Sequence, residues 1–198
     1  MPRPRPHPEP EAAAITHISD AAVGMMRATM AASVLPDRWE ALLGSLSDDC
    51  RRVFAAQPLP PWVSTAMVAE VVERYNALTG SDTANVRAIL LMDRLIGSGR
   101  PDLVAARNPW AALEAVKELF PRHHQGGVMD LEPAGSGALV KLWATIPYPH
   151  YLTMFVPAAL TRAVEICGAE RVRIEHRPPD PAVCAYLHRY QLSWTVWA

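Results

Sequence analysis

Apolar residues recur at the three- and four-residue spacing of amphipathic helices through most of the first 121 residues. Ser19-Asp20 is a favourable N-cap, and Pro36 fits the first turn of a helix. Asn108-Pro109 opens a further helix. These signals predict a mostly helical part over residues 15–121. The residues expected to face inward include Val23, Met26, Met30, Trp39, Leu42, Leu43, Leu46, Val71, Tyr75, Val86, Ile89, Leu90, Leu113 and Phe120.

Breaks in the pattern set the boundaries of the middle helices. Leu59-Pro60-Pro61 interrupts the chain, and a long helix is expected from Trp62 to Gly80. Ser81-Asp82 then provides a cap for a further helix that closes at Gly97. Pro121 is expected to end the helical part.

The last third of the chain alternates apolar and polar residues, which is the pattern of half-buried strands. Val172 and Ile174 share one face of a predicted strand, and residues 134–137 form a hairpin loop between two others. A helix near Pro157 separates the two pairs of strands. The sequence therefore predicts an α+β fold in which residues 126–198 form a four-stranded antiparallel sheet with a β-β-α-β-β arrangement.

Proline alternates with polar residues at the start of the chain, so residues 1–14 are expected to be a disordered tail before one domain over residues 15–198. The formal net charge of −1 gives no basic field for nucleic acid. Charges and prolines interrupt every apolar stretch, so no membrane span is expected. The three cysteines are widely spaced, which favours buried thiols in a cytoplasmic protein.

Sequence motifs give no support for catalysis. The chain has no G-x-S-x-G motif, and its histidines lack the spacing of a zinc site. We therefore expect no catalytic residues and no metal, although a triad assembled in space stays open. Aromatic and polar residues of the last third could instead line a ligand pocket or form ordinary core. The candidate ligand-binding residues are Trp143, Tyr148, His150, Tyr151, Phe155 and Trp194.

Several short motifs resemble an uncharacterised paralogous family abundant in myxobacteria. They are Val23-Gly24-Met25, Leu59-Pro60-Pro61-Trp62, Gly126-Gly127, Cys167 to Ile174 and Leu192 to Val196. The C-terminal order of elements is also similar to that of heme-nitric-oxide-binding domains and vinyl-reductase-like ligand-binding domains. This resemblance implies a pocket between a helical part and a sheet, without implying shared chemistry.

The resemblance to heme-nitric-oxide-binding domains implies a proximal histidine and a Tyr-x-Ser-x-Arg motif that holds the heme propionates. His123 or His124 could fill the histidine position. The second motif falls on residues 143–147, which contain no Tyr, Ser or Arg. Propionates need a bidentate cation and hydroxyl donors there, so we expect neither heme nor another cofactor.

The sequence thus predicts a non-enzymatic cytoplasmic module that binds a small apolar or amphipathic ligand or a protein partner, in a signalling or regulatory role. A structural interaction protein, such as a homodimer, is the alternative. An enzyme, or a heme or metal sensor, is a further alternative.

Overall fold

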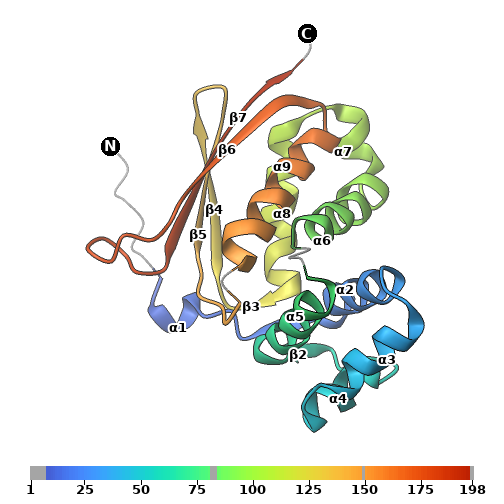
Figure 1. The fold of residues 1–198 in the computed structure, drawn as a ribbon. Coiled ribbons are helices and arrows are strands. Elements are labelled where there is room, and N and C mark those ends of the chain that lie inside the picture. Colours follow the sequence, from blue (N-terminus) through green and yellow to red (C-terminus); the bar gives the residue numbers. More distant parts are fainter. Residues whose placement is uncertain (1–7, 81–83, 149, 197–198) are drawn as a thin grey trace.

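The computed structural model describes residues 8–80, 84–148 and 150–196. A group of helices lies at one end, and a four-stranded sheet stands beside further helices at the other (Figure 1). The helices are α1 (Pro10–Ala13), α2 (Asp20–Ala32), α3 (Pro36–Gly44), α4 (Asp48–Ala55), α5 (Thr65–Thr79), α6 (Ala84–Met92), α7 (Pro101–Ala106), α8 (Pro109–His123) and α9 (Val156–Ile166), with π-helical turns η1 (Asp93–Ser98) and η2 (Tyr151–Phe155). The strands are β1 (His17–Ser19), β2 (Trp62–Ser64), β3 (His124–Gln125), β4 (Val128–Ala134), β5 (Gly137–Trp143), β6 (Ala169–Arg177) and β7 (Leu187–Val196).

The four-stranded sheet is antiparallel, with strand order β4-β5-β7-β6, and confirms the predicted α+β fold. Residues 134–137 turn the first hairpin, where Ala134 pairs with Gly137. Burial alternates along β6, so that Val172 and Ile174 pack against the main core while Arg171 and Arg173 face solvent. Helix α8 packs against β4 and α9 against β6, which covers one face of the sheet.

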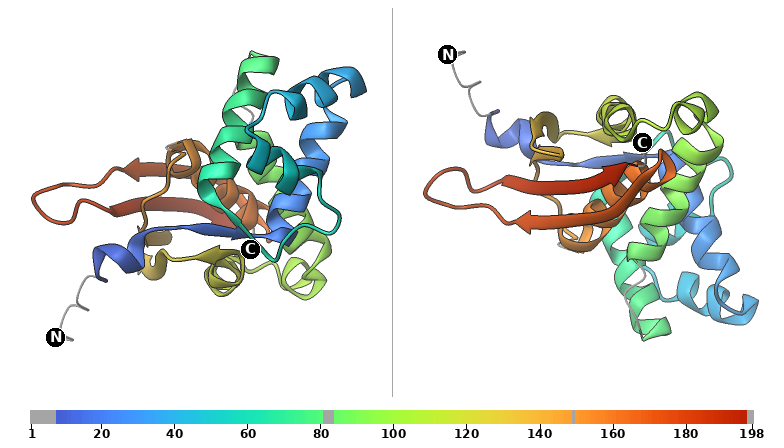
Figure 2. Two further views of the ribbon diagram at one scale, coloured as in Figure 1. Left: turned by 90° about the horizontal axis from the view of Figure 1, so that it is seen from below. Right: turned by 90° about the horizontal axis from the view of Figure 1, so that it is seen from above.

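The segment that connects the two pairs of strands begins with the wide turn η2 and continues directly into α9. Pro157 is the second residue of α9, in agreement with the predicted helix that begins near Val156 or kinks after a short preceding turn. Beyond α9, the loop between β6 and β7 extends away from α3 and α4, at the opposite end of the molecule (Figure 2). No helix among the described residues is both long and apolar enough to cross a membrane.

A second, small sheet joins distant parts of the chain, with strand order β2-β1-β3. The sequence did not predict these strands, because two or three residues are too few for alternation to be visible. Trp62, expected to start a helix, lies in β2 instead. The helix α5 begins at Thr65, where the Ser64 side chain accepts a hydrogen bond from the Ala66 N–H.

Residues 9–14 differ from the expected disordered tail. Helix α1 is followed by backbone pairing, because the Ile15 N–H donates to the Thr145 carbonyl at 2.9 Å. Gly126 approaches the same segment so closely that a Cβ atom there would lie 1.8 Å from the Ala14 carbonyl oxygen. Gly126 also has a φ of +87°, which glycine adopts without strain. This contact fixes the segment against the body of the protein, and Ala13 is fully buried.

Helix α6 buries a different face from the one that the sequence predicts. Val86, Ile89 and Leu90, expected inside, are 54%, 39% and 45% exposed. Arg87 is only 7% exposed and lies in the interior. The expected cap at Ser81-Asp82 lies outside the described residues. Helix α8 also continues past the predicted stop at Pro121 and ends at His123.

Candidate functional site

A cavity of about 130 Å³ lies among α2, α5, α6, α8 and the η2–α9 segment. Most of its wall is aliphatic or aromatic. The sheet predicted to form one wall of the pocket contributes little, because Met129 of β4 is its only described residue in the lining. The cavity therefore lies mainly between helices, at the junction of the two parts of the fold.

Four methionines, Met25, Met26, Met92 and Met129, line the cavity. A methionine side chain is unbranched and polarisable, so it adapts to ligands of different shape. Phe120 and Phe155 add flat apolar surface to the same wall. The interior can therefore adjust around an apolar molecule without loss of contact.

His124 and Tyr151 form a buried polar pair in the cavity wall. The Nδ1 atom of His124 lies 3.0 Å from the Phe120 carbonyl, which can only accept, so Nδ1 carries the proton. The Nε2 atom therefore accepts from the Tyr151 hydroxyl at 2.6 Å. Burial lowers the pKa of His124 to about 4, although the Phe120 carbonyl opposes the shift. Both ring nitrogens of this neutral histidine are thus engaged.

The Tyr151 hydroxyl is held in its protonated form by the same environment, because burial raises its pKa. Its ring also stacks on Phe155, with ring centroids 5.0 Å apart. His124 stacks on Phe120 at 4.4 Å. These contacts fix the polar pair rigidly, so it forms a neutral part of the wall at physiological pH.

His123 lies beside this pair, at the end of α8. Its Nδ1 atom is 2.8 Å from the Ser19 hydroxyl oxygen, and Ser19 also caps α2 by accepting from the Ala22 N–H. Burial lowers the pKa of His123, with a smaller contribution from the Arg122 charge, while Asp20 opposes both. The contact joins the start of α2 to the end of α8 at the margin of the cavity.

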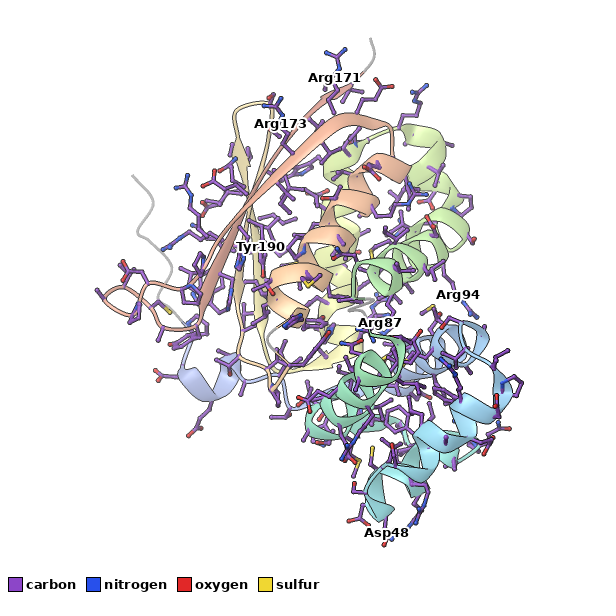
Figure 3. The ribbon with its side chains drawn as sticks, viewed as in Figure 1. Asp48, Arg87, Arg94, Arg171, Arg173 and Tyr190 are labelled. Atoms are coloured by element: carbon purple, nitrogen blue, oxygen red, sulfur yellow. The ribbon has the colours of Figure 1, made fainter. Side chains whose placement is uncertain are left out.

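Arg87 supplies a positive charge to the cavity wall, at the junction of α6 with the helical group α2–α5 (Figure 3). Its Nη2 atom donates to the Tyr148 hydroxyl at 3.4 Å, and both residues are buried. No acidic side chain is present among the described residues of the lining. The described lining is therefore mostly apolar, and Arg87 is the permanently charged residue in it.

Three of the six ligand-binding candidates, Tyr148, Tyr151 and Phe155, line the cavity. The other three lie elsewhere. His150 is exposed and stacks on Tyr148, with centroids 5.6 Å apart. Trp143 packs in a separate cluster with Ala13, Cys184 and Leu187, and Trp194 packs against the main core outside the cavity.

Sequence reasoning missed Arg87 and the methionines of the wall. The sequence did not indicate that Arg87 is buried, because an arginine next to apolar Val86 is expected on the solvent-exposed face of an amphipathic helix. Met26 was predicted as inward-facing core and Met25 was not, and nothing local distinguishes core from cavity lining. Their shared location depends on the packing of helices far apart in the sequence.

A second histidine pair lies on the helix-facing side of the large sheet. The Nε2 atom of His176 is 3.0 Å from the Nδ1 atom of His188, and both rings stack with Tyr190. Burial and the neighbouring His176 lower the pKa of His188 to about 4. No group of three or more metal-binding side chains occurs in the described part of the chain. Cys50, Cys167 and Cys184 are free and buried.

The comparisons with known proteins found chains of similar structure, without a match of sequence to a family model or a curated protein. Among solved structures, the Fe(II) unliganded H-NOX protein from K. algicida matches with a TM-score of 0.68 and 8% identity, over 90% of this chain and 97% of that chain. An H-NOX protein from S. oneidensis in the Fe(II)NO ligation state matches with a TM-score of 0.61 and 12% identity, over 90% of this chain and 99% of that chain. The chain therefore has the fold of these H-NOX structures.

Proposed function

We propose that this protein is a non-enzymatic module that binds a small apolar or amphipathic ligand in the cavity and acts in regulation. The apolar cavity itself is the observation that carries the proposal. Protein interiors are close-packed, so voids larger than a water molecule are few. A dry aliphatic cavity of roughly 150 Å³ accommodates benzene in another protein. A cavity of about 130 Å³ with adaptable methionines is suited to the same class of ligand.

The H-NOX fold supports a ligand-binding role, since the solved neighbours include a protein with Fe(II) and bound NO. Polar groups in the described part of the wall engage one another in neutral pairs such as His124 with Tyr151. Such groups orient a ligand without reacting with it.

Native mass spectrometry of the protein as purified tests the proposal, because it reports bound ligand and subunit number together. Thermal stabilisation of the protein by benzene, a ligand that matches the cavity in size, provides a quantitative assay. Ala159, buried on α9, lines the cavity, so Ala159→Leu should reduce benzene affinity severalfold by filling the space. The matched control is Ala105→Leu on the exposed surface of α7.

The proposal fails if the wild-type protein binds neither a co-purified molecule nor benzene. It also fails if both alanine variants retain wild-type affinity, since benzene would then bind outside the cavity. A dimer without any bound molecule would favour the alternative of a structural interaction protein.

The fold raises heme sensing as a second candidate, but the residues present do not fit heme. Both nitrogens of His124 are engaged, and His123 is hydrogen-bonded to Ser19. Elsewhere in the lining, α8 presents only Val116, Leu119 and Phe120. The segment at residues 143–147 offers no guanidinium, and its backbone pairs with the N-terminal segment. An absorbance scan after reconstitution with hemin should show no Soret band of a ligated heme, and such a band would overturn this conclusion.

A further inference from the structure

A chain of hydrogen bonds in the cavity wall runs from the backbone to the Tyr151 hydroxyl. The Nδ1–H group of His124 donates to the Phe120 carbonyl at 3.0 Å, and its Nε2 atom accepts from Tyr151 at 2.6 Å. Each bond in such a chain polarises the next, so a hydroxyl that donates to the histidine becomes a stronger acceptor at its oxygen. Among the described residues, His124 is the hydrogen-bond partner of this hydroxyl. The Tyr151 oxygen therefore keeps a lone pair that can accept from a ligand.

Other polar groups in the described lining are less suited to accept a proton from a ligand. The Arg87 guanidinium can only donate, and the Tyr148 hydroxyl already accepts from it at 3.4 Å. The Thr29 hydroxyl donates to the Met25 carbonyl at 2.9 Å, within the same helix. Its oxygen keeps a lone pair too, but it is not the end of a longer chain through a polarisable ring. Tyr151 therefore offers the stronger acceptor.

The cavity beside this pair has the size and the walls for one aromatic ring. Its volume of about 130 Å³ is close to the roughly 150 Å³ of a cavity that holds benzene, so a long chain does not fit. Phe120 lies in the wall and stacks on His124, with ring centroids 4.4 Å apart. Phe155 stacks in the same way on Tyr151 at 5.0 Å. Aromatic rings and methionine sulfur atoms both make favourable contacts with a further ring.

We propose that the ligand is a small phenol, whose ring fills the cavity and whose hydroxyl donates a hydrogen bond to the Tyr151 oxygen. This inference rests on the proposed function, because it names the chemical class of the molecule that occupies the same cavity. Tyr151 is then a specificity-determining residue. Without an acceptor in the wall, the buried hydroxyl of a phenol would be unpaired, which is costly, whereas a hydrocarbon of the same size would bind unaffected.

The test compares phenol with toluene, in which a methyl group replaces the hydroxyl. Both affinities are obtained from the thermal stabilisation of the protein at increasing ligand concentration. The decisive variant carries His124→Phe and Tyr151→Phe together. It removes both partners of the polar pair at once, and replacement of both partners by apolar groups of similar shape is nearly neutral for stability.

Two single variants complete the set. Thr29→Val removes the rival hydroxyl of the wall with little change of shape. Tyr75→Phe is the matched control, because it removes a buried tyrosine hydroxyl that is hydrogen-bonded to Ser33 at 2.6 Å and lies outside the described lining.

We expect phenol affinity to fall at least about tenfold in the double variant, while toluene affinity changes by less than about twofold. Thr29→Val and Tyr75→Phe should keep the wild-type ratio of the two affinities. If the double variant does not fold, nuclear magnetic resonance of isotope-labelled histidine in the wild-type protein decides the question. Phenol should shift the ring-nitrogen resonances of His124 because it extends the hydrogen-bond chain, and toluene should shift them far less.

An unchanged affinity ratio in the double variant, or equal nitrogen shifts with both molecules, would overturn the phenol proposal and leave the ligand-binding function in place. A ratio that falls in Thr29→Val and not in the double variant would assign the acceptor to Thr29 and overturn the role of Tyr151. If neither phenol, toluene nor benzene binds, the proposed function fails together with this inference.

Discussion

The His124–Tyr151 pair should make the stability of the protein depend on pH. The folded protein holds His124 neutral, with a pKa lowered to about 4 by burial, whereas the ordinary value is near 6.5. Between these two values the unfolded chain binds a proton that the folded protein does not. The stabilisation is therefore complete above pH 6.5 and is lost as the pH falls toward 4.

The magnitude follows from the two pKa values. Linkage gives a loss of about 2 kcal/mol between pH 8 and pH 5, and about 3 kcal/mol at the acid limit. His188, with a pKa lowered to about 4, contributes a loss of its own. Because that second loss is common to the wild-type protein and a His124→Gln variant, the difference between their pH profiles isolates His124.

The free energy of unfolding is measured by urea titration of both proteins at several values between about pH 8 and pH 5. The variant should be less stable at the alkaline end, where it lacks the histidine's hydrogen bonds and its stacking on Phe120. It should then lose about 2 kcal/mol less than the wild-type protein as the pH falls. If the pH-dependent loss in the free energy of unfolding differs between the two proteins by less than about 0.5 kcal/mol over this range, the neutral, buried state of His124 is refuted.

Two further substitutions test the contacts that position the cavity. Gly126→Ala should destabilise the protein in thermal melts by more than about 3 kcal/mol, because the new Cβ would meet the Ala14 carbonyl and alanine is strained at this positive φ. The control is Gly44→Ala, which has open space around it and should be neutral or stabilising by about 0.5–1 kcal/mol in the same melts. Ser19→Ala should cost about 1–2 kcal/mol in urea unfolding, because it removes the cap of α2 and the contact with His123, and an unchanged midpoint would show that neither contributes.

Elements with a distinct polar face were predictable from the sequence. Helix α2 follows an N-cap at Ser19, α8 follows Asn108, and β6 alternates charged with apolar residues, so each pattern identifies both the element and its buried side. Helix α6 lacks such a face, because only Asn85 and Arg87 in it are polar. Its orientation could not be predicted, and for that reason the position of Arg87 in the cavity wall was missed.

The sequence by itself determined the α+β class, the hairpin at residues 134–137 and the crossover helix beside Pro157, since these depend on periodicity and turn residues a few positions apart. Only the tertiary structure decided which helices meet around the cavity. Met26, Arg87, Phe120 and Tyr151 come from four separate segments, and the pairing of β1 with β2 and β3 brings distant segments together. Contacts over such separations leave no local pattern, because packing selects them from many arrangements with the same periodicity.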